Sequence, residues 1–378
     1  MVNQEISSAQ DRRKLKMRSD EKINKIWSVN EWGKLKEIIV GRPHGAFVPD
    51  FTDISRMNFE RTNFDEPYPY EELRKVQARH QMPQRIIDET EEDIQELIRV
   101  LKEHGVIVHL ASDADFSQPI KSNLWEAQQE AGINIRDLTL IHGNVVIEAP
   151  SGNRGRYFED FVLRDLFDDY RQRDQAAWFV APHRPRLRDE TYDLTRPVGL
   201  NETEPIFDAA NCLRLGKHLL IDINNSANHA GADWIQQTIN KHYGKGRIRL
   251  HKVRYFTDHI DVIVLPLREG TFLLNPLYVN QDKLPEELQN WDVIYSPEMI
   301  PQEYHNEVPK ASNCIGLNLL VLDGEERTVI VEKSQTPLIR TLEENKFRVI
   351  PVTWRHGRTW GGAFHCVTLD LHREGELD

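Results

Sequence analysis

The sequence has few cysteines, no long apolar run and no excess of positive charge. Its three cysteines, Cys212, Cys314 and Cys366, are far apart and form no C-x-x-C pair. Neither a disulfide framework nor a cysteine-based zinc site is therefore favoured. No run approaches the roughly 20 apolar residues of a membrane span, and the N-terminus lacks the apolar core of a signal peptide. A formal net charge of -12 argues against broad binding to nucleic acid or anionic membranes. These absences favour a cytoplasmic protein.

The 378 residues are enough to bury a large core. Residues 1–27 are polar with little periodicity, and we expect them to form an N-terminal arm before a single domain of residues 28–378. Within this domain, glycine-containing turns join pairs of apolar runs, which is the signal of a β-hairpin. Such pairs occur at 138–147, 213–222, 262–274 and 317–331. A segment whose pattern predicts a helix follows each pair, at 158–172, 232–243, 283–289 and 337–345. Further strands are expected at 248–253, 293–295 and 347–352. Residues 35–40, 82–103 and 106–110 form a related set of strand, helix and strand.

Five hairpin–helix–strand units of unequal length predict an α/β fold. A repeated unit that cannot bury its own apolar face stacks against its neighbours. Five such units can close into a ring, with strand ends around a central axis. An ordinary open α/β sheet is the alternative. Residues 41–80 and 173–205 lack periodicity and are expected to be long insertions, serving as lids or as oligomer contacts of the kind that a homodimer would use.

The strongest chemical candidate is Cys366, which follows the turn Trp360-Gly361-Gly362. Glycine has no Cβ, so its backbone can approach a ligand closely, and a thiol at the end of such a turn is placed where a substrate can reach it. We interpret Cys366 as a nucleophile. The alternative is that it is a small buried hydrophobic residue, which is the commoner role of a free cysteine and the one we expect for Cys212 and Cys314.

Cysteine chemistry also needs a proton donor and a group that orients it. His259 and Asp261 are two residues apart, so in an extended segment their side chains lie on one face. Asp208 stands between apolar residues, and Asp137 opens a hairpin. Each also has a structural interpretation: a surface histidine, a turn cap and a local cap. His365 adjoins the cysteine but points to the opposite face of a strand, which makes it a poor base for the thiol. Carboxylates near a thiol suit a guanidinium substrate, because its planar fork binds carboxylates through two hydrogen bonds.

Five ordered segments resemble the amidinotransferases: EWGKLKEIIVGR (31–42), RDLTLIHGNVVIEAP (136–150), FDAAN (207–211), HID (259–261) and GGAFHC (361–366). That family includes the arginine:glycine and arginine:inosamine-phosphate enzymes. The resemblance covers roughly Trp27 to the end, and within the family it is strongest to the cyanobacterial enzymes of toxin biosynthesis, above all of the saxitoxin pathway. It implies a five-bladed α/β propeller of the guanidino-modifying (pentein) superfamily, with the active site on its axis.

The resemblance also assigns roles. Cys366 matches the family nucleophile, His259 the general acid/base and Asp208 the residue that orients this histidine. Asp137 and Asp261 match the carboxylates that grip the guanidinium. The thiolate would attack L-arginine, release L-ornithine with a proton from His259, and pass the amidino group from the cysteine to a primary amine. Two half-reactions through one covalent species imply ping-pong kinetics, with no metal or organic cofactor.

Departures from the family pattern concern the substrate pocket. Asn275-Pro276-Leu277-Tyr278 lacks the arginine that helps the glycine enzymes hold the donor carboxylate. The pocket is expected to include Ser312, and Phe256, Asp258 and Gly316 suggest an acceptor that is larger, more apolar and more cationic than glycine. The resemblance implies the amine of an arginine-derived polyketide intermediate. Glycine or an aminocyclitol is the alternative acceptor, a deiminase or dihydrolase is the alternative reaction, and a catalytically inactive propeller is the alternative from another class.

Overall fold

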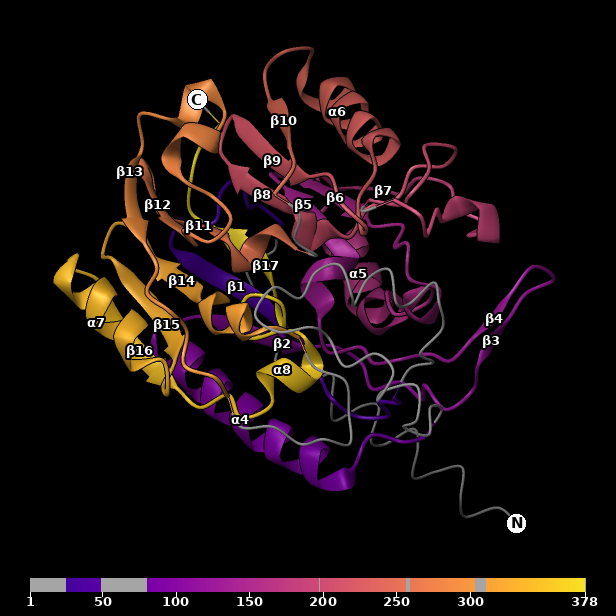
Figure 1. Cartoon of the computed structure of the whole chain (residues 1–378), viewed down its shortest axis with the longest axis horizontal. Helices are drawn as coiled ribbons and strands as arrows, with labels where there is room; N and C mark the ends of the chain where they lie inside the picture. Colours follow the sequence, from indigo (N-terminus) through magenta and orange to yellow (C-terminus); the bar gives the residue numbers. More distant parts are fainter. Residues whose placement is uncertain (1–24, 49–79, 197, 256–258, 303–310, 378) are drawn as a thin grey trace.

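The computed structural model describes residues 25–48, 80–196, 198–255, 259–302 and 311–377. Five three-stranded sheets organise these residues. In strand order they are β17 (Thr368–Arg373), β1 (Leu35–Val40) and β2 (Ile107–Leu110); β5 (Thr139–His142), β6 (Val145–Glu148) and β7 (Trp178–Val180); β8 (Cys212–Leu215), β9 (His218–Asp222) and β10 (Arg249–Val253); β11 (Val264–Arg268), β12 (Thr271–Leu274) and β13 (Asp292–Tyr295); β14 (Leu320–Asp323), β15 (Thr328–Glu332) and β16 (Arg348–Val352). A two-stranded ribbon, β3 (Ile120–Lys121) and β4 (Glu126–Ala127), projects from one side (Figure 1).

Each sheet has one antiparallel and one parallel pairing, as a hairpin followed by a crossover requires. The first sheet obtains its antiparallel pair differently. Strand β1 pairs with β17 from the other end of the chain, with Val40 opposite Thr368, and is parallel to β2. The first unit is therefore completed by the segment that follows Cys366, which the sequence pattern did not predict.

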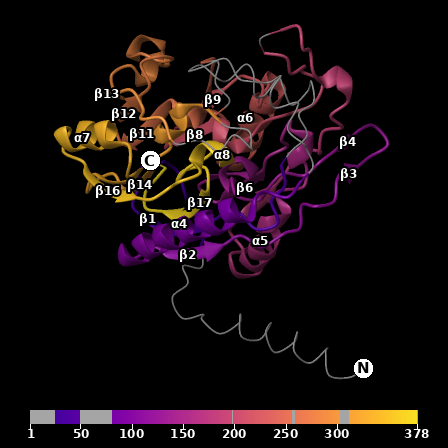
Figure 2. The same cartoon turned by 60° about the horizontal axis from the view of Figure 1, so that its bottom comes forward.

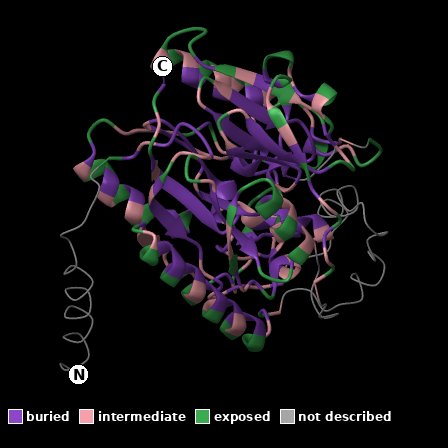
Figure 3. Ribbon diagram, turned by 90° about the vertical axis from the view of Figure 1, so that its left-hand side faces the viewer, coloured by how far each residue is buried: buried purple, intermediate pink, exposed green. Residues whose placement is uncertain are grey.

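Helices make four of the crossovers. They are α4 (Gln84–Glu103), α5 (Phe161–Arg173), α6 (His229–Tyr243) and α7 (Thr336–Glu344). Each has one apolar side; in α4 it includes Ile94, Leu97 and Leu101, all fully buried. Figure 3 shows the consequence, because exposed residues line the outer side of the helices while the strands inside are buried.

The helix predicted at residues 283–289 is wrong. The structure has two short 3₁₀ turns there, Gln281–Lys283 and Glu286–Leu288, separated by Pro285. Proline has no backbone N–H to donate, and a segment this short cannot offset the cost of helix nucleation. The crossover between β12 and β13 is consequently irregular.

The five sheets follow one another in a cycle. β17 contacts β5, the turn before β8 contacts β5, the turn before β11 contacts β8, the turns before β11 and β14 contact each other, and β14 contacts β1. Figures 1 and 2 show the corresponding arrangement, with helices outside the strands. The α/β class built from small repeated sheets is confirmed, and the open-sheet alternative is wrong because the strands form separate sheets. The cyclic order is the one that a five-bladed propeller requires.

The structure describes part of the expected N-terminal arm and part of both expected insertions. Ile26 is fully buried and Trp27 bridges to His372, so the folded part already includes the last residues of the expected arm, whose residues 1–24 lie outside the described part. In the insertion at 173–205 the structure has β7, and Leu187, Tyr192 and Leu200 of this insertion form a small apolar cluster with Ile206, which follows it. Of the insertion at 41–80, residues 49–79 lie outside the description. None of the described helices is long and apolar enough to cross a bilayer.

Candidate active site

The predicted catalytic residues occupy equivalent places in the repeated units. Asp137 lies in the 3₁₀ turn Ile135–Leu138 before β5, Asp208 precedes the turn Ala209–Asn211 before β8, and His259 precedes the turn Ile260–Val262 before β11. Asp261 lies within this last turn, and Cys366 is two residues ahead of β17. Because successive turns contact one another, these entry points of the units meet at the centre of the cycle.

His259 lies between two carboxylates. Its Nε2 is 3.2 Å from Asp208 Oδ2, and its Nδ1 is 3.5 Å from Asp137 Oδ1. Burial raises the pKa of Asp208, but the hydrogen bond with His259 and the nearby charge of Arg156 outweigh it and leave this pKa below its ordinary value. An ionised Asp208 is suited to orient the imidazole and to stabilise its charged form. The expected contact between Asp208 and His259 is present.

Cys366 lies beside Asp261, with 3.4 Å between Sγ and Oδ2, and only 1% of the residue is exposed. Burial raises the pKa of the thiol well above its ordinary value, and the negative charge of Asp261 raises it further. A hydrogen bond with His259 opposes these two effects. The free thiol is thus held neutral close to both the histidine and the carboxylates.

The two glycines before Cys366, Gly361 and Gly362, are required for different structural reasons. Gly361 ends the short helix α8 (Gly357–Trp360) with a φ of 65°, a backbone conformation that glycine adopts readily. A Cβ on Gly362 would lie 2.3 Å from Asn134 Oδ1 and 2.7 Å from the Cβ of Cys366. Close packing against Asn134 and Cys366 thus explains Gly362, and an approach of this backbone to a ligand stays a prediction.

Arg156, which the sequence did not indicate as a site residue, lies beside both Asp137 and Asp208. Arg156 Nη1 is 2.7 Å from Asp137 Oδ2 and 4.0 Å from Asp208 Oδ2. Its Nε makes a 2.7 Å ion pair with Glu159. Burial raises the pKa of Asp137, and the charges of His259 and Arg156 only partly offset this. Arg156 is outside the segments that resemble a family, and no feature of its local sequence indicated this position.

Asp261 has two further partners that the sequence did not suggest. His365 Nδ1 is 2.7 Å and Asn318 Nδ2 is 3.0 Å from Asp261 Oδ2. The Oδ1 of Asn318 accepts hydrogen bonds from the backbone N–H groups of Ala363, at 3.0 Å, and Cys366, at 2.9 Å. Asn318 therefore ties the backbone of the cysteine to the carboxylate. The segment 259–261 is not extended as expected, yet its turn still directs both polar side chains to the centre.

Three buried carboxylates of the site each retain one oxygen that hydrogen-bonds to none of the described residues. These atoms are Asp137 Oδ1, Asp208 Oδ1 and Asp261 Oδ1. Within the described part of the chain, Asp137 Oδ1 has only the 3.5 Å contact with His259 Nδ1. A buried charged oxygen without a hydrogen-bond donor is costly, so native proteins keep few of them. The arrangement is suited to a flat cation with several N–H donors.

The residues predicted to shape the acceptor pocket are less informative. Ser312 Oγ accepts a hydrogen bond from the backbone N–H of Cys314, which caps the turn Asn313–Leu317. Gly316 lies in that turn, where a Cβ would be 2.9 Å from the side chain of Gln335, so packing alone explains the glycine. Phe256 and Asp258 lie outside the described residues. A pocket role for these four residues stays a prediction.

No family model matches the sequence, but individual relatives do. The inosamine-phosphate amidinotransferase 1 of Streptomyces glaucescens is 37% identical over 353 residues, covering 92% of this chain and 97% of the relative. The L-arginine:L-lysine amidinotransferase of Pseudomonas savastanoi pv. phaseolicola is 31% identical over 373 residues, covering 93% and 96%.

Solved structures agree. An amidinotransferase of the saxitoxin biosynthetic pathway from Microseira wollei has a TM-score of 0.82 and 32% identity, and the inosamine-phosphate amidinotransferase of Streptomyces griseus has 0.83 and 34%. Each comparison covers 93% of this chain and 98% of the other. A dimethylarginine dimethylaminohydrolase of Pseudomonas aeruginosa shares the fold alone, with a TM-score of 0.57 and 14% identity over 89% of this chain and 99% of that one.

The fold is therefore that of the guanidino-modifying, or pentein, enzymes. Within that class the chain belongs to the amidinotransferase family.

Proposed function

We propose that the protein transfers the amidino group of L-arginine to a primary amine and releases L-ornithine, through an amidino group covalently bound to Cys366. The observation that carries this proposal is that one carboxylate oxygen each of Asp137, Asp208 and Asp261, around a buried thiol, accepts no hydrogen bond from the described residues. A guanidinium presents several N–H donors in one plane and suits such a set better than the compact ammonium of lysine does.

The first half-reaction begins with the thiol. A guanidinium held by Asp137 and Asp261 brings positive charge close to Sγ, which lowers the pKa of the thiol and favours the thiolate. The thiol gives its proton to His259, the sulfur attacks the guanidinium carbon, and the bond from that carbon to the side-chain nitrogen of arginine breaks. His259 gives its proton to this nitrogen, so that ornithine leaves as an amine.

The second half-reaction reverses these roles. The neutral His259, oriented by Asp208 through the 3.2 Å contact, accepts a proton from the incoming primary amine. The amine nitrogen attacks the amidino carbon, the carbon–sulfur bond breaks and the thiolate is restored. Because ornithine leaves before the acceptor reacts, the enzyme follows ping-pong kinetics.

For the acceptor, we propose an amine larger than glycine, such as that of an arginine-derived polyketide intermediate. Relatives above 30% identity carry the names of lysine, inosamine phosphate and the saxitoxin pathway. Leu277, in the segment that lacks the family arginine, is 73% exposed and offers apolar surface next to Tyr278. Turnover with glycine should be lower than with long-chain primary amines, and a clear preference for glycine contradicts this part of the proposal.

The decisive experiment is intact-mass analysis after incubation with arginine alone. Transfer predicts an adduct equal to one amidino group, with one equivalent of ornithine released, and no adduct on a Cys366→Ala variant. A deiminase instead expels ammonia, leaves an adduct that still contains the ornithine part, and produces citrulline. A Cys212→Ala variant is the matched control, since Cys212 is also a buried free cysteine. An unmodified wild-type protein would contradict the proposal.

A further inference from the structure

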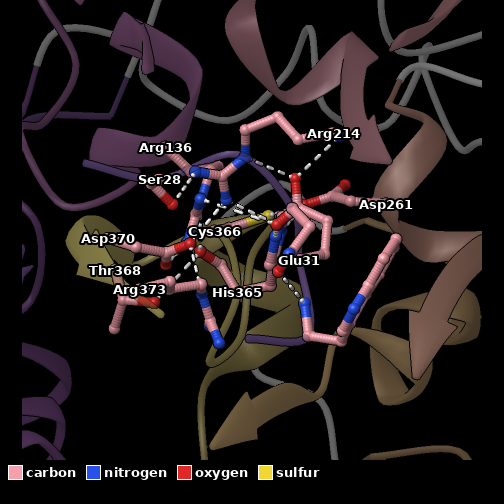
Figure 4. Close-up of polar contacts among 12 residues, drawn as sticks. Ser28, Glu31, Arg136, Arg214, Asp261, His365, Cys366, Thr368, Asp370 and Arg373 are labelled. Carbon is pink, nitrogen blue, oxygen red and sulfur yellow. Dashed lines mark hydrogen bonds and ion pairs between the residues drawn. The ribbon is translucent and has the colours of Figure 1, made fainter. Parts of the chain in front are cut away.

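The imidazole of His365 lies between two buried carboxylates. Its Nδ1 is 2.7 Å from Asp261 Oδ2 and its Nε2 is 3.3 Å from Glu31 Oε2, and Figure 4 shows the three side chains beside Cys366. A neutral imidazole has one N–H and can donate to only one carboxylate, whereas the protonated ring donates from both nitrogens. The geometry therefore fits an imidazolium.

Glu31 is itself fixed as an anion. Arg214 donates to it from Nε at 2.7 Å and from Nη2 at 2.6 Å, and Arg136 Nη1 is 4.0 Å away. The same two arginines also contact Asp370, so positive and negative side chains alternate in this buried cluster of Glu31, Arg214, Asp370 and Arg136 (Figure 4). Glu31 cannot turn away from His365 without leaving a buried guanidinium underpaired, which is costly.

The charged groups that face His365 are Glu31, Asp261 and Arg136. Burial and the charge of Arg136 lower the pKa of the imidazole, but the hydrogen bonds and charges of the two carboxylates outweigh them and leave it raised. Glu31, Asp261 and His365 also line one small cavity with Leu213, Val264 and Leu265. These apolar neighbours reduce screening, which strengthens the ion pairs.

The two carboxylate oxygens of Asp261, which is in contact with His365, have different hydrogen-bond partners. Oδ2 accepts hydrogen bonds from His365, Asn318 and the thiol of Cys366, whereas Oδ1 has no hydrogen-bond partner among the described residues. A carboxylate held by one oxygen at three points cannot rotate freely. The unpartnered Oδ1 is therefore left with a fixed direction.

We propose that His365 is a positioning residue: a cation held between Glu31 and Asp261, it keeps Asp261 ionised and its Oδ1 available to the donor's guanidinium. The identity of the guanidinium rests on the proposed function. The charge state of His365 and its effect on Asp261 do not, and they can be tested separately.

The first test measures the charge directly. Nitrogen-15 NMR of the histidine rings in the wild-type protein without substrate should show His365 still protonated where a free histidine, with a pKa of about 6.5, has lost its proton. A His365→Gln spectrum assigns the signal. A neutral His365 ring at neutral pH overturns the inference, whatever the protein catalyses.

The second test measures the effect on the reaction. In His365→Gln the neighbouring cation is gone, so Asp261 accepts a proton more easily and the acid limb of kcat/KM for arginine should move up by about 1–3 pH units. Glu31→Gln should move it less in the same direction, because the imidazole keeps its contact with Asp261. His109→Gln is the matched control: His109 also pairs with a buried glutamate, Glu37, at 2.6 Å on the strands β1 and β2, and its loss should leave the limb in place.

The outcomes separate the two proposals. A His365→Gln variant that unfolds cooperatively and forms the amidino adduct, but keeps the wild-type acid limb, overturns the positioning role and leaves amidino transfer standing. A wild-type protein that forms no adduct overturns the proposed function, while the NMR titration still decides the charge of His365. Should His365→Gln not fold, Glu31→Gln and the wild-type titration decide instead.

Discussion

Replacing Asp261 with asparagine should make the thiol of Cys366 easier to ionise while making the enzyme slower. The carboxylate oxygen is 3.4 Å from Sγ, and its negative charge is the largest cause, after burial, of the raised pKa of the thiol. Two unit charges at this separation interact by about 5 kcal/mol at an effective dielectric constant near 20. Since about 1.4 kcal/mol corresponds to one pKa unit, the upper limit of the effect is about 3.5 units.

The sign follows from the charges. Ionising the thiol next to Asp261 brings two negative charges together, and asparagine removes this repulsion at nearly constant volume. In the free protein we therefore expect the thiol pKa to fall by about 1–3 units in Asp261→Asn. Turnover of arginine should nevertheless fall, because the guanidinium loses one of the carboxylates that hold it.

The assay is the ultraviolet absorbance of the thiolate, followed against pH. The same titration of Cys366→Ala is subtracted, which removes the signals of Cys212, Cys314 and the tyrosines. A thiol pKa in Asp261→Asn that is unchanged or higher would refute the electrostatic reasoning. A lower pKa with undiminished turnover would show that Asp261 does not hold the donor.

Three further predictions concern neighbouring charges. Asp208→Asn should lower turnover by about 100-fold or more because His259 loses its orienting anion, and steady-state kinetics across pH should show the loss at every pH tested. Arg156→Lys keeps the charge but loses the planar fork that serves Asp137 and Glu159, so arginine turnover should fall about 10-fold or more with little change in melting temperature; equal losses of both would contradict a role in the site. Burial raises the pKa of Asp370, but its arginine partners hold it well below the ordinary value, so its stabilisation is complete above the unfolded pKa of about 3.9 and is lost as pH falls through the lower folded value. Asp370→Asn should therefore reduce the free energy of unfolding by about 3–5 kcal/mol near neutral pH in urea titrations, and a change below 1 kcal/mol would be unexpected.

Much of the fold was readable from the sequence because the units repeat. The apolar pairs at 138–147, 213–222, 262–274 and 317–331 are hairpins, and the helix predicted at 82–103 begins two residues later and ends at the same residue. These signals are local, since alternation and turn chemistry act within about ten residues. The pairing of β1 with β17 was not predicted, because no local pattern specifies a partner more than 300 residues away.

The site shows the same division. Asp208 contacts His259, and Cys366 lies beside Asp261. These residues could be singled out from the sequence because they stand in segments whose order is characteristic of a family. Arg156 was missed because an arginine in a polar stretch carries no sign of its destination. His365 was expected to point away from Cys366 across a strand, which is wrong: residues 364–367 form a turn, and both side chains contact Asp261 Oδ2. Glu31 received no role, because its local sequence does not indicate which distant side chain it will meet.

The pairing of β1 with β17 has a consequence for the order of assembly. A ribosome makes β1 early and must add most of the chain before β17 exists, so the first blade waits unfinished while the other four are synthesised. Cys366 is two residues ahead of that closing strand. The step that pairs β17 with β1 is therefore also the step that brings Cys366 to the centre of the cycle, beside Asp261.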